Sequence, residues 1–238
     1  MAHISLITIP REAVKWRFLR PYELHRTLWK GFKGLKEGEQ EKRFLYRHNE
    51  EESHHSILLQ SVTEPDWSFL ANESEGVLAS TRPYHPEKIP LQQPLRFMLR
   101  ANPVVSRKYP DGRSRRIVIG SDRKRMKELM GVSTLEEVPT REELLTTWLR
   151  NQGDRGGFRL EEVSEGRSSR TLCDVGPNRD IILRKPQQRE SKERITITTV
   201  DFTGILSVTD PKLFADTIRH GIGRARGFGC GLLSVARV

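Results

Sequence analysis

The sequence predicts an α+β protein in which two β-α-β-β-α-β units follow one another. Three observations lead to this prediction. Several short segments alternate apolar and polar residues with a period of two, as half-buried strands do. Longer segments with helix start and stop signals lie between them, and a proline-rich stretch separates two halves of similar element order. This order is that of the ferredoxin-like (RRM-like) fold, so we expect two such domains in tandem.

The first half supplies strands around one helix. Pro21 and Gly34 mark the ends of the helix, because proline fits the first helical position and glycine follows the last turn. Strands are expected at residues 3–9, 43–49, 53–63 and 76–85. The boundary between the domains is marked by Pro83, Pro86, Pro90 and Pro94. We therefore expect domains at residues 1–90 and 95–238.

The second half repeats the scheme with longer parts. One helix is expected to begin at the capping residue Thr140, and another to cover residues 210–221. Strand-like segments cover residues 94–109, 114–120, 158–166, 180–186, 193–208 and 230–238. The two helices lie between these strands, which completes the β-α-β-β-α-β order in this half.

The distribution of charge favours a polyanionic partner. The chain of 238 residues carries a formal net charge of +10. Residues 1–104 hold 15 basic and 13 acidic side chains, a net of +2, whereas residues 105–238 hold 26 and 18, a net of +8. Such an excess in one half is typical of proteins that bind nucleic acid. A membrane surface is the competing partner, but the sequence lacks a basic amphipathic helix with an aromatic face.

Several other classes are excluded by composition. Apolar runs are too short for a membrane span, so no membrane partner is expected. The start of the chain lacks a signal-peptide cleavage pattern. Cys173 and Cys230 are too few for a disulfide scaffold or a cysteine zinc site. We expect a cytoplasmic protein.

Basic residues gather in three runs in the second half. The first holds nine Arg or Lys side chains between Arg107 and Lys127. The second surrounds a turn between two strands and contains Arg184, Lys185, Arg189, Lys192 and Arg194. The third contains Arg224 and Arg226. A single run is often only a solvated face, but three in one half favour contacts with nucleic-acid phosphates.

The third run lies in a glycine-rich segment near the end of the chain, with Gly221, Gly223, Gly227, Gly229 and Gly231. Their spacing fits neither a dinucleotide-binding fingerprint nor a Walker loop. A helix cap followed by a turn explains one or two of the glycines. Bare backbone that approaches RNA phosphates, neutralised by the two arginines, explains the whole segment better.

One helix carries residues that suit acid–base chemistry. Tyr22 and His25 are three residues apart, and with Trp29 they share one helical face. A histidine and a tyrosine can handle the protons of RNA cleavage without a metal ion, because RNA supplies its own 2′-hydroxyl nucleophile. An ordinary packing pair at the rim of a core is the alternative. The other six histidines lack metal-ligand spacing, so no metal ion is expected. We also expect no cofactor and no small-molecule ligand.

Four motifs resemble those of the CasE (Cse) family, the repeat-processing endoribonucleases of type I-E CRISPR systems. They are YELHRTLW, LRANP, GILSVTD and GIGRARGFGCGLLSVA, at residues 22–29, 99–103, 204–210 and 221–236. The resemblance implies two ferredoxin-like domains, with His25 and Tyr22 as catalytic residues. It also implies that the glycine segment, and a basic turn at residues 184–194 that enters a major groove, contact the RNA.

The resemblance further implies a reaction and partners. The enzyme is expected to cut precursor CRISPR RNA at the base of each repeat hairpin, leaving a 2′,3′-cyclic phosphate and a 5′-hydroxyl. It is then expected to stay on the hairpin as a subunit of the Cascade complex. A non-catalytic subunit that binds structured RNA is the alternative. A DNA-binding regulator finds no support, because the sequence has no helix-turn-helix or zinc-finger pattern.

Overall fold

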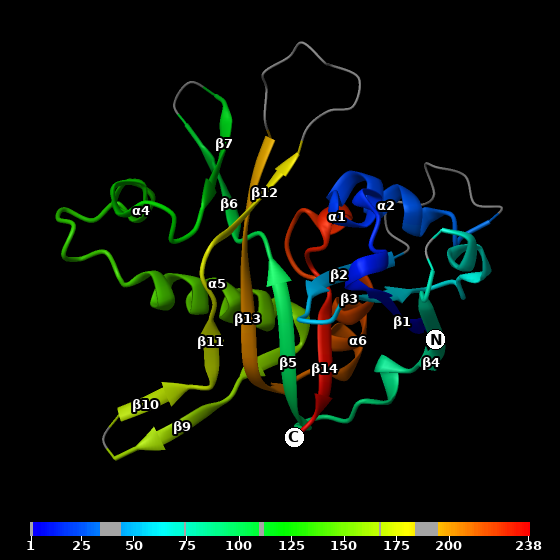
Figure 1. Cartoon of the computed structure of the whole chain (residues 1–238). Coiled ribbons are helices and arrows are strands. Elements are labelled where there is room, and N and C mark those ends of the chain that lie inside the picture. The colour runs from blue at the N-terminus through cyan, green and yellow to red at the C-terminus, as the bar shows by residue number, and fades with distance from the viewer. Residues whose placement is uncertain (1, 34–43, 74, 110–111, 167, 184–194) are drawn as a thin grey trace, which may run out of the picture.

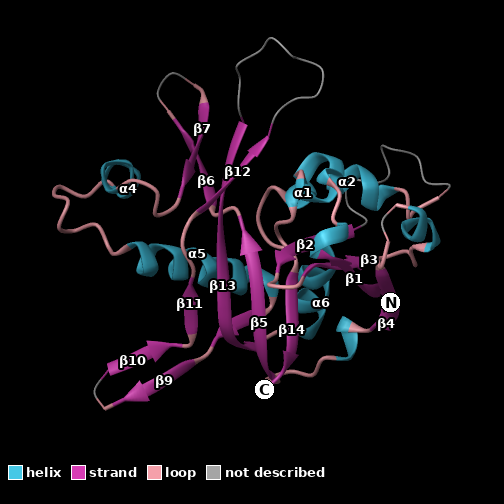
Figure 2. Ribbon diagram, in the orientation of Figure 1, coloured by secondary structure: helices cyan, strands magenta, loops and turns pink. Residues whose placement is uncertain are grey.

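The computed structural model describes residues 2–33, 44–73, 75–109, 112–166, 168–183 and 195–238 (Figure 1). The described chain forms two antiparallel sheets, one from each half of the sequence, and helices pack on both (Figure 2). No helix among the described residues is long and apolar enough to span a membrane.

The first sheet has the strand order β2-β3-β1-β4. Its strands are β1 (Ala2–Pro10), β2 (Phe44–Glu50), β3 (His54–Ser61) and β4 (Leu78–Tyr84). All three pairs are antiparallel, and Ile7 of β1 lies opposite Ile57 of β3. This is the strand order of a ferredoxin-like sheet, so the four strands expected in this half are present.

Two helices precede β2, namely α1 (Trp16–Leu19) and α2 (Pro21–Trp29). Leu24 and Leu28 of α2 are buried against the sheet. Between β3 and β4 the chain forms a 3-10 helix, Ser68–Asn72, in the position of the second helix of the pattern. Pro65 precedes it, and the Asp66 side chain accepts a hydrogen bond from the Ser68 backbone N–H, which favours a turn over a longer helix.

The second sheet has the order β11-β13-β5-β14, and β8 and β12 also pair with β13. These strands are β5 (Pro94–Ala101), β8 (Phe158–Leu160), β11 (Cys173–Val175), β12 (Arg179–Leu183), β13 (Ile195–Val208) and β14 (Leu233–Arg237). The helices α5 (Arg141–Gly156) and α6 (Pro211–His220) cover one face (Figure 2). Leu149 and Phe214 from these helices pack with Phe202 of β13 in one core.

Three elements project from the second sheet. They are the hairpin of β6 (Val104–Lys108) and β7 (Ser114–Val118), the helix α4 (Arg123–Met130), and the hairpin of β9 (Glu162–Glu165) and β10 (Ser168–Thr171). Two strands expected from sequence are therefore divided. Pro103, which has no backbone N–H, separates β5 from β6, and the segment at 158–166 splits into β8 and β9.

The two sheets are joined by hydrogen bonds that side chains make to backbone across the interface. Arg47 of β2 donates to the Met98 carbonyl, and Gln60 of β3 donates to the Ile218 carbonyl. Arg100 of β5 donates to the His48 carbonyl at 2.7 Å. Arg47 and Gln60 are buried. These bonds join β2 and β3 of the first unit to β5 and α6 of the second.

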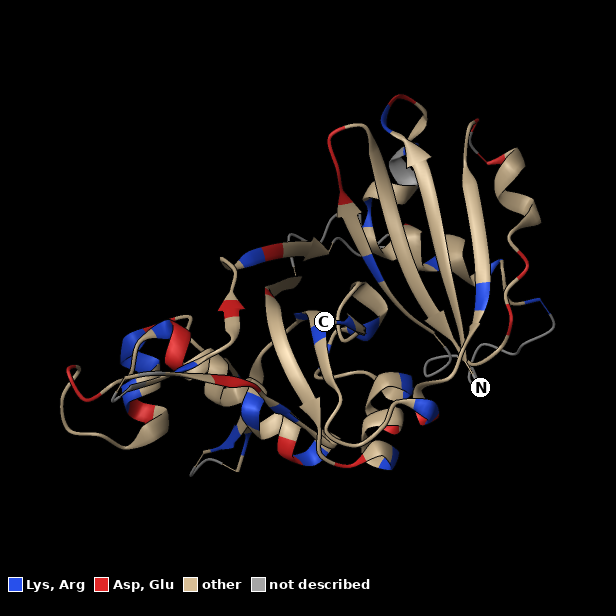
Figure 3. Cartoon of the chain, turned by 90° about the horizontal axis from the view of Figure 1, so that it is seen from below, with Lys and Arg blue, Asp and Glu red and all other residues tan. Residues whose placement is uncertain are grey.

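Charge is unevenly placed on this framework. Figure 3 shows many Lys and Arg segments on α4 and its surroundings in the second unit, whereas the strands of the first sheet are mostly uncharged. The sequence predicted this asymmetry between the halves.

Candidate functional site

His25 lies in the last two turns of α2 and is half-buried among aromatic rings. Its ring centroid lies 5.2 Å from that of Phe44 and 6.2 Å from that of Tyr46. The indole Nε1 of Trp29, one turn further along the helix, donates a hydrogen bond to His25 Nε2 at 2.8 Å. Burial lowers the pKa of His25 from 6.5 to about 4, so the imidazole is neutral at neutral pH.

Tyr22 stands at the start of the same helix, three residues before His25. Its side chain is 44 % exposed, in contrast to the half-buried imidazole. The helix therefore presents one exposed tyrosine and one half-buried histidine. A shared role for the two side chains stays a prediction.

The glycine segment folds over this helix from the far end of the chain. It follows α6, includes a 3-10 helix, Arg226–Phe228, and contacts α2 and β2. In Figure 1 the red segment before β14 lies beside the blue α1 and α2. A β-carbon added to Gly227 would lie 3.5 Å from Cε1 and 3.7 Å from Nδ1 of His25. The backbone of Gly227 thus lies directly against the imidazole.

The Tyr46 side chain links the glycine segment to α2 by hydrogen bonding. Its single buried O–H is shared between the Gly227 carbonyl oxygen at 3.1 Å and the Pro21 carbonyl oxygen at 3.3 Å. Gly229, with a φ of +82°, occupies a left-handed conformation that disfavours other residues. Gly221, Gly223 and Gly231 also have positive φ.

The two arginines of the segment are placed differently. Arg226 is half-buried, donates to the Gly223 carbonyl at 3.1 Å, and has a pKa that burial lowers. Arg224 is exposed and donates to the Ser106 hydroxyl at 3.3 Å. Arg226 therefore stabilises the turn, whereas Arg224 places a cation beside the β6–β7 hairpin. Their contact with RNA stays a prediction.

The predicted basic turn falls outside the described residues. Its five cations are Arg184, Lys185, Arg189, Lys192 and Arg194. The strands β12 and β13, which flank the turn, pair with each other.

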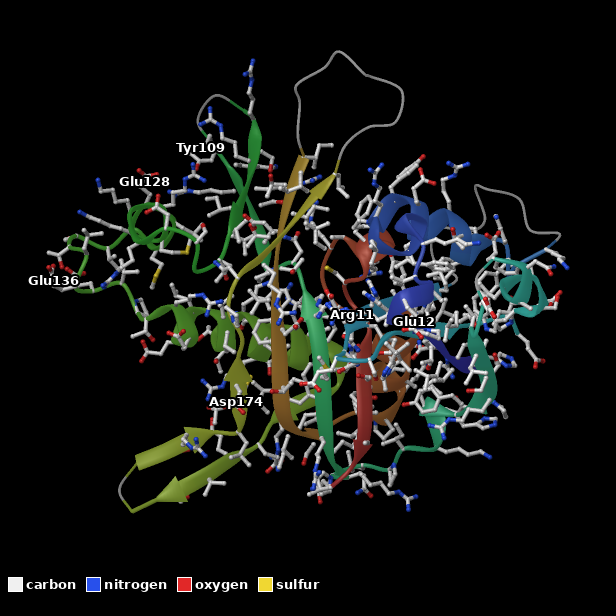
Figure 4. All side chains as sticks on the ribbon, viewed as in Figure 1. Arg11, Glu12, Tyr109, Glu128, Glu136 and Asp174 are labelled. Atoms are coloured by element: carbon white, nitrogen blue, oxygen red, sulfur yellow. The ribbon has the colours of Figure 1, made fainter. Side chains whose placement is uncertain are left out.

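The β6–β7 hairpin is a second basic arm, which the sequence marked as a charged run without assigning its residues to a site. The guanidinium groups of Arg107 and Arg115 lie over the Tyr109 ring, at 5.7 and 4.7 Å from its centroid. Arg107 also donates to the Glu128 carbonyl of α4. Figure 4 shows Tyr109 on this arm, close to α4. The density of nine cations over residues 107–127 was the sequence signal for it.

The described part of the chain offers no cluster of side chains suited to binding a metal ion. No group of three or more His, Cys, Asp or Glu side chains there could hold a metal ion. His55 is buried and hydrogen-bonded to His48 at 3.0 Å, whereas His54, its neighbour on β3, contacts Ser53. These two adjacent histidines thus point to different surroundings, as strand geometry predicts.

Comparison with known proteins identifies the family. A profile described as CRISPR associated protein matches residues 2–237, and the Thermus thermophilus CRISPR-associated endoribonuclease Cse3 is 34% identical over 91% of this chain and 90% of its own length. The chain belongs to the CasE (Cse3) family. The Escherichia coli K12 relative, Cascade subunit CasE, is 26% identical over 90% of this chain and 91% of its own.

Solved CasE structures share the fold. A structure of Cse3 bound to a 19-nucleotide RNA superposes with a TM-score of 0.70 at 29% identity, and covers 99% of this chain and 100% of that one. The E. coli protein Cas6e superposes at 0.57 with 24% identity, over 99% and 100% of the two chains. The prediction of tandem ferredoxin-like domains is confirmed.

Proposed function

We propose that the chain is a metal-independent endoribonuclease that cleaves precursor CRISPR RNA at the base of the repeat hairpin and then stays bound as a Cascade subunit. One relative is named an endoribonuclease and another a Cascade subunit, and a similar structure holds RNA. Within this chain, the proposal rests on one observation: the imidazole of His25 lies against the bare backbone of Gly227. We also propose that the reaction takes place in the cytoplasm.

The proposed chemistry uses the substrate's own nucleophile. The 2′-oxygen of the nucleotide upstream of the cut bonds to the adjacent phosphorus and loses its proton. The bond from phosphorus to the 5′-oxygen of the next nucleotide breaks, and that oxygen gains a proton. His25 and Tyr22 are the pair that handles these two protons. The products carry a 2′,3′-cyclic phosphate and a 5′-hydroxyl.

The proposed RNA-binding surface combines three basic parts. They are the β6–β7 arm with Arg107 and Arg115, the glycine segment with Arg224, and the turn at residues 184–194. Neutralising a cation that meets a phosphate should flatten the salt dependence of binding by about 0.7–0.9 in the logarithmic slope. An unchanged slope for every single substitution in one of the parts would remove that part from the surface.

The mechanism is tested with a repeat-hairpin RNA in EDTA. We expect cleavage to persist and the product ends to be a 2′,3′-cyclic phosphate and a 5′-hydroxyl. A 2′-deoxy nucleotide upstream of the cut should abolish cleavage and preserve binding, because it deletes only the nucleophile. A 5′-phosphate product, or activity that requires added magnesium, would refute the mechanism.

The role of His25 is tested by His25→Ala, with His54→Ala as the control. General acid–base groups contribute about 10²- to 10⁴-fold, so His25→Ala should slow single-turnover cleavage by that factor at nearly unchanged RNA affinity. His54 lies on β3 and contacts Ser53, so its replacement should leave the rate unchanged. If His25→Ala cleaves as fast as the wild type, His25 only packs against its neighbours and takes no part in the reaction. Absence of cleavage by the wild-type chain, with tight hairpin binding, would favour the non-catalytic RNA-binding subunit instead.

A further inference from the structure

The hydrogen bond between Trp29 and His25 determines where the imidazole carries its proton. An indole Nε1–H can only donate a hydrogen bond. His25 Nε2, 2.8 Å away, is therefore the acceptor and bears no hydrogen. A neutral imidazole holds one proton, so that proton is on Nδ1.

The other ring nitrogen of His25, Nδ1, lies in a different environment from Nε2. His25 Nδ1 is buried and has no hydrogen-bond partner in the described residues. The site for a β-carbon of Gly227, which glycine leaves empty, lies 3.7 Å from it. A buried donor without an acceptor is unfavourable, so an incoming oxygen atom that accepts from Nδ1–H would relieve this cost. RNA phosphate and ribose oxygens are such acceptors.

We propose that Trp29 is a positioning residue: its indole N–H occupies Nε2 of His25, fixes the imidazole as the Nδ1–H tautomer, and leaves Nδ1 as the nitrogen that meets the RNA. The part of this inference that concerns cleavage rests on the proposed function. The part that concerns the tautomer does not, because it follows from the contact itself.

The surroundings of Trp29 hold its indole in place. Its ring packs edge-on against Phe44, with 4.7 Å between centroids, and against Phe32 at 5.7 Å. Phe44 also packs against His25. One aromatic cluster thus orients both members of the hydrogen bond. Protonation of Nε2 would place two N–H donors face to face, so Nε2 takes up no proton while this bond is intact. In that state His25 meets the RNA as an Nδ1–H donor, and it exchanges a proton with the RNA only after the indole N–H has moved away from Nε2.

The tautomer is measured directly by ¹⁵N NMR of the full chain, labelled at histidine. The signal of His25 is assigned by its loss in His25→Asn. At neutral pH we expect a protonated Nδ1 and an unprotonated Nε2. A proton on Nε2 in the wild-type protein would overturn the proposal, and this measurement requires no RNA and no activity.

The positioning role is tested by Trp29→Phe against Trp67→Phe. Both tryptophans belong to the same core, and each change removes one indole N–H. Trp67 differs in that its Nε1 has no hydrogen-bond partner in the described residues, and its ring packs against Phe32 and Phe69 rather than against His25. We expect Trp29→Phe to move the His25 proton at least partly to Nε2. We also expect it to slow single-turnover cleavage at least about 10-fold at unchanged hairpin affinity, because a His25 that carries its proton on Nε2 presents a lone pair at Nδ1 and cannot donate to the RNA oxygen.

Equal tautomer populations and equal rates in Trp29→Phe and Trp67→Phe would overturn the proposal. The failure of the proposed function is a separate result. If His25→Ala cleaves as fast as the wild type, His25 is not catalytic, and the NMR measurement still decides whether Trp29 sets its tautomer.

Discussion

Replacing Gly227 and Gly229 separately by alanine distinguishes a glycine needed for catalysis from one needed for folding. At Gly227 the new methyl carbon would meet the His25 ring at 3.5–3.8 Å, which is ordinary van der Waals contact. The φ of Gly227 is not among the positive values. Gly227→Ala should therefore fold with a change in unfolding free energy below about 1 kcal/mol.

The same methyl group fills the space beside Nδ1 that an RNA oxygen needs. An oxygen that accepts a hydrogen bond from Nδ1 must approach to about 2.9 Å, and the methyl carbon would lie 3.7 Å from that atom. Displacing a reacting group by about 1 Å can cost 10²-fold in rate. We expect Gly227→Ala to cleave about 10- to 100-fold more slowly in a single-turnover assay.

Gly229→Ala should behave in the opposite way. An alanine at a φ of +82° is strained by about 1–2 kcal/mol, which in a chain of this size lowers Tm by roughly 2–8 °C. Its methyl would lie 3.5 Å from the Tyr46 ring, in ordinary contact and away from His25. Cleavage measured well below Tm should stay near the wild-type rate. The reasoning would be refuted if Gly227→Ala cleaved at the wild-type rate while Gly229→Ala was as stable as the wild type.

Three further predictions follow from the structure. Gly221→Ala should lower Tm by more than any other single alanine in the glycine segment, because φ is +74° and the new carbon would lie 2.7 Å from a backbone oxygen; an unchanged melting curve would contradict this. Ala225 has a φ of +59°, so Ala225→Gly should raise the unfolding free energy by up to about 1 kcal/mol in urea titrations, and a loss would contradict the strain argument. Burial lowers the pKa of His25 and His48 from 6.5 to about 4, so the unfolded chain binds more protons between these values and Tm should fall as pH decreases from about 7 to 4.5. In His48→Asn this fall should be shallower, and an equally steep fall would exclude His48 as its source.

Local signals in the sequence were sufficient for most of the elements. Thr140 was expected to cap a helix, and it accepts from the Glu143 backbone N–H while the Glu143 side chain accepts from the Thr140 N–H. The helix α4 was not predicted from the sequence, because its segment was interpreted as a basic run and the helix-capping residues beside it were not considered. Asp122 accepts from the Lys124 backbone N–H, and Gly131 ends the helix with a φ of +71°. Both residues are ordinary helix signals that the sequence contains.

The candidate site was predictable only in its parts. The spacing of Tyr22, His25 and Trp29 placed them on one helix face, but a spacing does not say that an indole N–H meets an imidazole nitrogen. Gly227 comes from the other half of the chain, and only the packing of the two sheets brings it to His25. Sequence patterns with periods of two or four carry no information about such a contact. The composition of the glycine segment indicated a close approach, but not to which group.

The hydroxyl of Tyr46 connects the Pro21 and Gly227 carbonyls, so the site joins a segment from near the start of the sequence to one from near its end. This has a consequence for synthesis on the ribosome. A nascent chain displays the histidine helix long before the glycine segment exists, and the same holds for any product of premature termination. Such chains lack the backbone that lies against His25 and the bond that fastens it. If His25 and the glycine segment form the proposed site, we expect cleavage of RNA to begin only after translation has passed the glycine segment, and unfinished chains to be inactive towards the transcripts around them.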